Sequence, residues 1–366
     1  MHPPELTRRQ FIIGASAAAA LMGPGSLAAA VAAKPATARW RGFNLIEMSG
    51  WMPQPRFVES DFALLAGWGF NFARLPLSYW CWSDPKDWGK IDERALAPLD
   101  EAIGWGRQYG IHLNLCLHRI PGYCINERER EPEQLFSGNQ PASPRALAAA
   151  AHHWEFLARR YRQVSPERLS FDLLNEPPFM KDQTEYVAIC RTLISAIRAV
   201  SPDRTIVVDG ADIGQTPVLG LLRDNVIQST RGYLPKMVSH YTAQWVPERE
   251  FESHEYPSWP MTDNQGVRWD KEKLRAELIT RWQPFVEGGG RVHVGEWGCY
   301  SRTPHAACLA WMSDMLELWR EAGWGWAMWN LRGDFGVMDS QRSDVKYENF
   351  QGHLLDRRML ELLLSH

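Results

Sequence analysis

Apolar strand-like segments and amphipathic helical segments alternate eight times along this chain, and this alternation restricts the possible folds more than any other feature. Each strand-like segment is short and nearly continuous in apolar residues, which is typical of parallel strands covered on both faces. The eight predicted strands are Trp40–Glu47, Phe70–Leu77, Ile111–His118, Leu169–Glu176, Thr205–Gly210, Val226–Tyr233, Arg291–Gly298 and Trp324–Leu331. The predicted helices that follow them are Glu59–Gly67, Asp92–Tyr109, Pro144–Tyr161, Thr184–Val200, Leu219–Asn225, Asp270–Glu287, Pro304–Glu321 and Leu354–Leu364.

Eight strand–helix units joined by short connections predict an α/β protein with a parallel sheet covered by helices. Within 366 residues, eight such units predict a (β/α)8 TIM barrel. A doubly wound open sheet is the alternative, but such a sheet rarely contains eight units in one unbroken domain. No linker or low-complexity segment interrupts residues 37–366, so we expect them to form a single domain.

The N-terminal segment differs in composition from the remainder of the chain. An arginine pair, Arg8-Arg9, precedes an Ala-rich apolar run that Gly23 and Pro24 interrupt. The run is too short for a membrane-spanning helix, and small residues with A-x-A spacing follow it. We expect residues 1–33 to be a cleaved export signal of the twin-arginine type, with an ordinary secretory signal as the alternative. Both predict a periplasmic or extracellular protein with no membrane span in the mature chain.

Composition narrows the choice of partners. The chain has 40 Lys and Arg against 43 Asp and Glu and no charged block, so nucleic acid is not expected as a partner. It has 18 Trp, more than its 14 Phe or 10 Tyr. Most of these belong in a core, but Trp also offers a flat platform for a sugar ring. The six cysteines lack C-x-x-C spacing, so we expect buried thiols, with one or two disulfides as the alternative.

Polar and aromatic residues stand where the predicted strands end. A TIM barrel carries its chemistry at this face, because the carboxyl ends of all eight strands meet there. Taken singly, each of these residues has a structural explanation, as an ion pair inside the barrel, a core aromatic or a loop anchor. Together they predict one site, and they are Arg74, His118, Asn175, Glu176, Arg231, Tyr233, Glu296, Trp329 and Asn330.

Two glutamates in this set suit the cleavage of a glycosidic bond. One carboxyl group must protonate the leaving oxygen, while a second attacks the anomeric carbon or activates water there. Glu176 and Glu296 end the fourth and seventh predicted strands, so they can face each other across the barrel mouth. Arg74 and the hydroxyl of Tyr233 could keep Glu296 ionised, since a positive charge lowers a carboxyl pKa. Asn175 could donate to a sugar 2-hydroxyl.

Seven motifs spread over the chain after its N-terminal segment resemble glycoside hydrolase family 5, the cellulase family of retaining (β/α)8 enzymes. They read "RGFNL", "FNFARLPLSYWCW", "CLHRIPGY", "DLLNEPP", "VHVGEWG", "GWGWAMWNLRGDFGVMDS" and "GHLLDRRMLELL". The resemblance implies Glu176 as the acid/base and Glu296 as the nucleophile. It also implies a supporting set that binds the substrate, which consists of Arg74, His118, Asn175 and Trp329.

One position departs from the family pattern, which usually has His-x-Tyr after the sixth strand. Here the chain reads "TRGYLPKMVSHYTAQW". Either Tyr233 is the family tyrosine and Arg231 replaces its histidine, or His240-Tyr241 takes that place. We prefer the first alignment, because the "YLP" sequence matches the family's usual continuation. Tyr233 is then expected within about 2.6–3.2 Å of Glu296, and His240 remains a candidate substrate-binding residue.

The family resemblance covers several β-glycans. We take β-1,4-glucan as the expected substrate, with β-mannan second and a non-catalytic carbohydrate-binding barrel as a further alternative. Such a barrel usually loses a catalytic carboxylate, whereas both glutamates are present here. The long segment 241–270 is expected to wall the cleft. We find no dinucleotide, serine-hydrolase or metal-ligand motif, so we expect no cofactor, no metal and a monomeric enzyme.

A retaining mechanism makes two further demands on the glutamate pair. Direct attack leaves no room for water between Glu296 and the sugar, so we expect the carboxyl groups about 5–5.5 Å apart rather than roughly 6.5–9.5 Å. Glu176 lies between Leu174 and two prolines and faces a second carboxylate. We therefore expect its pKa to be raised, so that it holds the proton that the leaving group needs.

Overall fold

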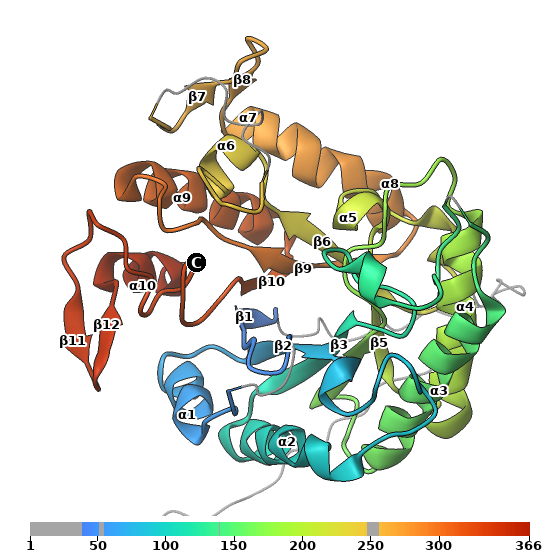
Figure 1. Ribbon diagram of the computed structural model, residues 1–366. Coiled ribbons are helices and arrows are strands. Elements are labelled where there is room, and N and C mark those ends of the chain that lie inside the picture. Colours follow the sequence, from blue (N-terminus) through green and yellow to red (C-terminus); the bar gives the residue numbers. More distant parts are fainter. Residues whose placement is uncertain (1–38, 51–54, 139, 247–255) are drawn as a thin grey trace, which may run out of the picture. The chain divides into compact units, whose positions relative to one another are not determined.

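The computed structural model describes residues 39–50, 55–138, 140–246 and 256–366 (Figure 1). The predicted export signal, residues 1–33, lies outside the described residues. Arg39–His366 form one compact unit. Within the described ranges, none of the helices combines the length and apolar character that crossing a bilayer requires.

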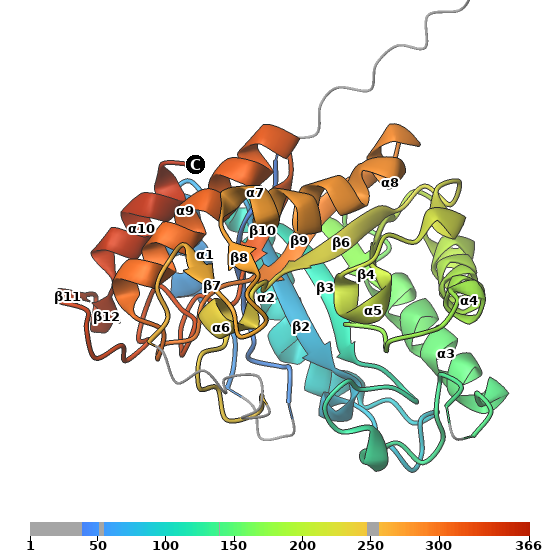
Figure 2. The same cartoon turned by 90° about the horizontal axis from the view of Figure 1, so that it is seen from above.

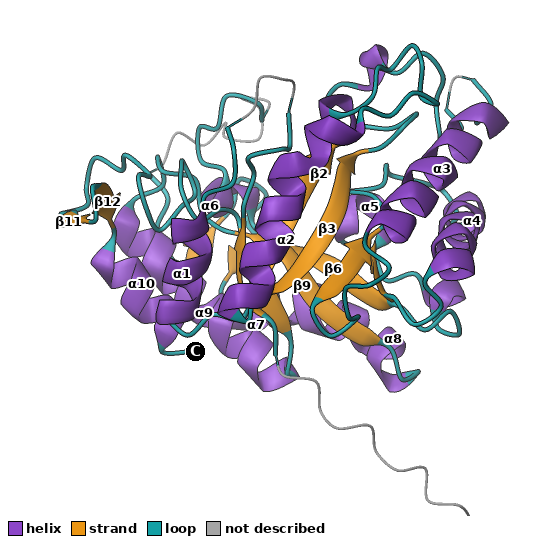
Figure 3. Ribbon diagram, turned by 90° about the horizontal axis from the view of Figure 1, so that it is seen from below, coloured by secondary structure: helices purple, strands orange, loops and turns teal. Residues whose placement is uncertain are grey.

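Eight parallel strands close into a barrel in the order β1-β10-β9-β6-β5-β4-β3-β2. This confirms the predicted (β/α)8 barrel, and each strand overlaps one of the eight predicted segments. Figure 3 shows the strands at the centre with helices around them. The barrel strands are β1 (Arg41–Asn44), β2 (Phe72–Ser78), β3 (His112–Arg119), β4 (Leu169–Asp172), β5 (Thr205–Asp209), β6 (Ile227–Gly232), β9 (Arg291–Trp297) and β10 (Gly325–Met328).

Six helices cover the barrel close to their predicted positions. Helix α3 (Pro144–Arg160) shows why a helix begins where it does. The Ser143 side chain accepts a hydrogen bond from the Ala146 N–H, and Pro144 occupies the first turn. The helix buries Trp154 and Leu157 against the barrel. In Figure 2 the two helices nearest the C-terminus, α9 and α10, run side by side. The six are α1 (Glu59–Gly67), α2 (Ala97–Tyr109), α3 (Pro144–Arg160), α4 (Thr184–Val200), α9 (His305–Ala322) and α10 (Arg357–Leu364).

Two of the predicted helices do not form as continuous α-helices. In place of a helix over Leu219–Asn225, the chain makes a 3-10 turn at Leu219–Leu221, preceded by the short α5 (Ala211–Gly214). Pro217 before the turn and Gly220 inside it leave too few residues to sustain a helix.

The predicted helix Asp270–Glu287 is broken into α7 (Lys271–Leu274), a π turn, a 3-10 turn and α8 (Gln283–Glu287). Pro284 lacks an N–H, and its ring would clash with the carbonyl four residues earlier, so a regular helix cannot pass it.

Several short elements extend from the barrel at its loops. The hairpin β7 (Met261–Thr262) and β8 (Arg268–Trp269) and the short α6 (Lys236–Ser239) lie between β6 and β9. A second hairpin, β11 (Glu348–Phe350) and β12 (His353–Leu355), occupies the start of the predicted last helix. Both hairpins project at the margin of the barrel in Figure 1.

The aromatic and cysteine residues mostly build the core, as expected. The largest fully buried side chains include six tryptophans, among them Trp297 of β9, which packs edge-on against Trp319 of α9. All six cysteines are buried free thiols. Trp329, which follows β10, and Trp245 instead line a cavity at the carboxyl ends of the barrel strands.

Candidate active site

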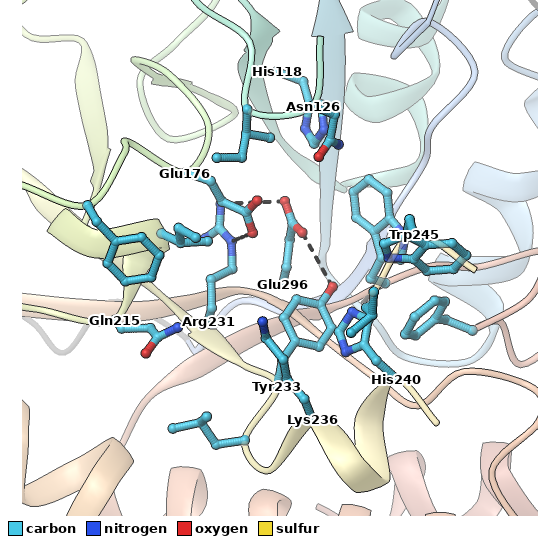
Figure 4. Close-up of a pocket in the computed structure, with 17 residues that line it drawn as sticks. His118, Asn126, Glu176, Gln215, Arg231, Tyr233, Lys236, His240, Trp245 and Glu296 are labelled. Carbon is cyan, nitrogen blue, oxygen red and sulfur yellow. Dashed lines mark hydrogen bonds and ion pairs between the residues drawn. The ribbon is translucent and has the colours of Figure 1, made fainter. Parts of the chain in front are cut away.

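A cavity of about 410 Å3 opens at the carboxyl ends of the barrel strands (Figure 4). Six of the eight residues that were predicted for catalysis or substrate binding line it: His118, Glu176, Tyr233, His240, Glu296 and Trp329. The other two, Arg74 and Asn175, are buried and contact residues that line the cavity. The structure therefore brings these eight residues together at one end of the barrel, and Arg231 lines the same cavity.

Glu296 of β9 lies among three donors. Arg74 Nη1 is 2.6 Å from Glu296 Oε1, and Arg231 Nη2 is 3.4 Å from the same oxygen. The Tyr233 hydroxyl donates to Oε2 over 3.3 Å. Because two guanidinium groups and a phenol face this nearly buried carboxylate, its negative charge is well stabilised.

Arg74 of β2 is fully buried and joins three strands of the barrel. Besides Glu296, it donates through Nε to Asp172 Oδ2 of β4 at 2.9 Å and through Nη2 to Asn175 Oδ1 at 2.9 Å. Burial disfavours its charge, but the surrounding anions outweigh this and raise the pKa of Arg74 well above its ordinary value. The same burial, together with the charge of Asp209, raises the pKa of Asp172 to about 6.

Asn175 has a fixed orientation. Its Oδ1 accepts from Arg74 at 2.9 Å and from Arg231 Nη2 at 2.8 Å. Two donors at one atom identify that atom as the amide oxygen rather than the nitrogen. Its Nδ2 is buried and has no hydrogen-bond partner among the described residues, so this donor is available to a ligand.

Glu176 follows β4 in the left-handed backbone region, with a φ of 49°. Two contacts hold its main chain: the Tyr123 hydroxyl donates to its carbonyl at 2.6 Å, and its N–H donates to Asp209 Oδ2 at 2.8 Å. Its side chain accepts from Arg231 Nε at 3.1 Å. Burial, and then the charge of Glu296, raises the pKa of Glu176 to about 7, although Arg231 acts in the opposite direction. The direction agrees with the sequence prediction.

The structure shows which tyrosine lies beside Glu296. Tyr233, not Tyr241, faces Glu296, although its 3.3 Å contact is slightly longer than the expected range. The Tyr241 ring instead packs 6.1 Å from that of Tyr256. His240 also reaches the cavity, with its ring 4.9 Å from the Tyr233 ring. Burial lowers the pKa of His240 to about 4, so its imidazole is neutral near pH 7.

An aromatic wall bounds the other side of the cavity. The Trp329 ring is stacked on His118, with centroids 5.7 Å apart. Burial lowers the pKa of His118 well below its ordinary value, and its Nδ1 has no partner among the described residues. Trp245, which is 58% exposed, and Phe335 continue the wall. Flat rings beside hydrogen-bonding groups suit a sugar, which has apolar C–H faces and a rim of hydroxyls.

Sequence reasoning missed one buried residue of the site, Asp209, and it did not foresee the contacts that Arg231 makes. Asp209 is the last residue of β5, at the same end of the barrel as Glu296 near the end of β9, and this position was a signal that could have identified it. The guanidinium of Arg231 pairs with both Glu176 and Glu296. One cation therefore reaches both carboxylates. Across the described ranges, no cluster of three or more His, Cys, Asp or Glu side chains is arranged to hold a metal ion.

Comparison with known proteins agrees with this geometry. The family model "Cellulase (glycosyl hydrolase family 5)" matches residues 31–334. Endoglucanase C of Acetivibrio thermocellus is 24% identical over 335 residues, which cover 83% of this chain and 95% of that protein. Cellodextrinase A of Ruminococcus flavefaciens is 28% identical over 219 residues, 56% of this chain and 62% of that protein.

Solved structures show the same architecture. A glycoside hydrolase crystal structure has 34% identity and a TM-score of 0.83, covering 89% of this chain and 99% of that one. Cel5A of Thermotoga maritima in complex with mannotriose has 19% identity and a TM-score of 0.70, covering 90% of this chain and 98% of that one. At this lower identity the likeness concerns the fold.

Proposed function

The chain belongs to glycosyl hydrolase family 5 and is a glycoside hydrolase, and from this premise we propose that it cleaves β-1,4-linked glucans with retention of configuration. In this proposal Glu176 is the acid/base and Glu296 the nucleophile. The observation that carries it is the contrast between the two carboxyl groups. Glu296 is surrounded by three donors, whereas burial and the charge of Glu296 raise the pKa of Glu176 to about 7.

In the first step, Glu176 gives its proton to the glycosidic oxygen while Glu296 Oε2 or Oε1 attacks the anomeric carbon. The bond between that carbon and the glycosidic oxygen breaks, the leaving sugar departs as an alcohol, and a glycosyl ester to Glu296 forms. In the second step, the Glu176 carboxylate takes a proton from water, which attacks the same carbon and breaks the ester. Two inversions give net retention, and both glutamates return to their starting states.

The supporting residues have roles that follow from their contacts. Asn175 presents its unpaired Nδ2 for the sugar 2-hydroxyl, a hydrogen bond that strengthens in the transition state. The Tyr233 hydroxyl and Arg74 hold the carboxylate of Glu296 in place for attack. Trp329 and His118 support the sugar ring at the cleavage point.

The form of the cleft favours an oligosaccharide or polysaccharide over a small glycoside. A second cavity of about 470 Å3 shares Gln215, Leu234 and Lys236 with the catalytic cavity and continues to Trp269 of the β7–β8 hairpin. Gln215 lies on the Glu176 side of the site in Figure 4. Since the acid protonates the leaving group, this extension suits the sugars that depart. The hairpin belongs to the segment 241–270 that was expected to wall the cleft.

Two glycans are candidate substrates. The relatives named endoglucanase and cellodextrinase favour β-1,4-glucan. The solved complex of Thermotoga maritima Cel5A with mannotriose keeps β-mannan as the second candidate. We also propose that Arg8 and Arg9 direct export and that the enzyme acts outside the cytoplasm as a monomer.

A substrate screen tests the proposal. Purified protein is incubated with carboxymethyl-cellulose, mixed-linkage β-glucan, glucomannan and xyloglucan, and released reducing ends are measured. We expect the fastest release from the β-1,4-glucans and none from the Glu296→Gln variant. Faster release from mannan would move the substrate to the second candidate. No release from any glycan would contradict catalysis and favour a binding protein.

A further inference from the structure

Asp209 and Arg231 form a buried ion pair between β5 and β6. Arg231 Nη1 donates to Asp209 Oδ1 at 3.0 Å, and Nη2 donates to Asp209 Oδ2. The Ser229 hydroxyl lies 3.0 Å from Nη1 and fixes the guanidinium from a third side. The Arg231 side chain is only 2% exposed and that of Asp209 is fully buried. The pair is therefore a rigid unit, since a buried bidentate pair has little freedom to reorient.

This unit contacts Glu176 at both its main chain and its side chain. Asp209 Oδ2 accepts the Glu176 N–H at 2.8 Å, which holds a residue whose positive φ is unfavourable for a side chain such as glutamate. Arg231 Nε donates to Glu176 Oε1 at 3.1 Å. Among the described residues, Arg231 forms an ion pair with Glu176, whereas Glu296 pairs with both Arg231 and Arg74.

We propose that Asp209 and Arg231 are positioning residues that hold Glu176 as the acid and set the pH above which it can no longer protonate the leaving group. This inference rests on the proposed role of Glu176 as acid/base. In the alignment that we prefer, Arg231 takes the place of the usual family histidine, and Asp209 supplies the opposite charge that a buried arginine requires. In this proposal the ion pair therefore controls the protonation of the leaving group by Glu176.

The two partners act on Glu176 with opposite signs. Arg231 favours the ionised carboxylate and lowers the pKa of Glu176, while Asp209 raises it. Burial and Glu296 also raise this pKa and bring it to about 7. The phenols of Tyr123 and Tyr233 stay neutral, because burial raises their pKa. The titratable and charged groups that face Glu176 are Tyr123, Asp209, Arg231, Tyr233 and Glu296.

Kinetics of three variants test the inference: Arg231→Gln, Asp209→Asn and the double variant, which removes both charges of the pair together. The activity of each is measured from pH 5 to 10 as kcat/KM on cellotetraose, whose leaving group needs a proton. The same measurement is made on 2,4-dinitrophenyl β-cellobioside, whose leaving group departs without a proton. Arg204→Gln is the matched control, because Arg204 is a buried arginine that binds three main-chain carbonyls near the amino end of β4.

Arg231→Gln should move the alkaline limb of the cellotetraose profile upward by about one pH unit, and Asp209→Asn should move it downward. Both should lower kcat/KM on cellotetraose roughly tenfold to a hundredfold. The loss on the dinitrophenyl substrate should be smaller for both variants, and below about threefold for Asp209→Asn, because Arg231 also contacts Glu296. The double variant should lie between the two in pH, and Arg204→Gln should leave the limb in place.

Equal losses on both substrates with no shift of the limb would overturn the inference and leave the pair a structural role. That result requires an active wild type. A wild type that cleaves neither substrate would contradict the proposed function itself, so the two failures are distinguishable. If Arg231→Gln does not fold, Asp209→Asn and the double variant decide the question with the same readouts.

Discussion

Replacing Glu176 with Gln should stabilise the folded protein at alkaline pH while it abolishes activity on poor leaving groups. The side chain of Glu176 is 17% exposed, and burial with the nearby charge of Glu296 raises its pKa from 4.5 to about 7. Gln has the same size and can still accept a hydrogen bond from Arg231. The substitution therefore removes a buried charge and leaves the packing intact.

The size of the effect follows from this pKa difference. One pKa unit corresponds to about 1.4 kcal/mol, so the carboxylate of Glu176 costs the folded state about 3 kcal/mol when fully ionised. The folded carboxyl holds its proton more tightly than the unfolded one. Its stabilising contribution is therefore fully present below about pH 4.5 and is lost as the pH rises through about 7. The Gln variant has no such dependence.

Urea unfolding followed by tryptophan fluorescence at pH 5 to 9 measures the prediction. The variant and the wild type should have similar free energies of unfolding at pH 5, and the variant should be more stable by about 3 kcal/mol above pH 8. Glu272→Gln is the control, since that side chain is 77% exposed and its substitution should have little effect at any pH. A difference that is constant with pH, or a variant less stable than wild type at pH 8.5, would refute the reasoning.

Three other changes have defined outcomes. Arg74→Gln should lower the free energy of unfolding by about 3–5 kcal/mol, because it leaves the buried carboxylate of Asp172 without its ion pair; a loss below about 1 kcal/mol in urea would contradict this. Tyr233→Phe should lower kcat/KM on cellotetraose roughly tenfold or more, since it removes a donor to the Glu296 carboxylate, and an unchanged value would exclude that role. Arg8→Lys combined with Arg9→Lys should retain the precursor in the cytoplasm in a fractionation assay. Normal export of this variant would indicate a general secretory signal instead.

The barrel was predictable because its signals are local. Each strand is a short apolar run, and the long helices α1 and α4 begin and end at the predicted residues. The predicted helix 270–287 failed because the apolar spacing continues through Pro284, whose backbone cannot. Apolar periodicity reports which face is buried, and it does not report whether the main chain can remain helical.

The site residues also differ in whether their signals are local in the sequence. Glu176 and Glu296 could be found because they end strands within specific motifs. Asp209 and Arg231 act through the register of neighbouring strands, in which Asp209 pairs with Ser229 and Arg231 with Glu296 across a shift. Such register depends on the closed barrel as a whole. A single sequence predicts the order of the strands along the chain, but it does not predict which side chains of two neighbouring strands lie opposite each other.

The stereochemistry of the first product tests the central claim most directly. Cellotetraose is mixed with enzyme in deuterated buffer, and the anomeric protons of the new reducing end are followed by NMR before mutarotation. Double displacement by Glu296 and Glu176 predicts that the β-anomer appears first and then equilibrates with the α-anomer. Initial release of the α-anomer would mean that water attacks directly, and the assignment of Glu296 as nucleophile would be wrong.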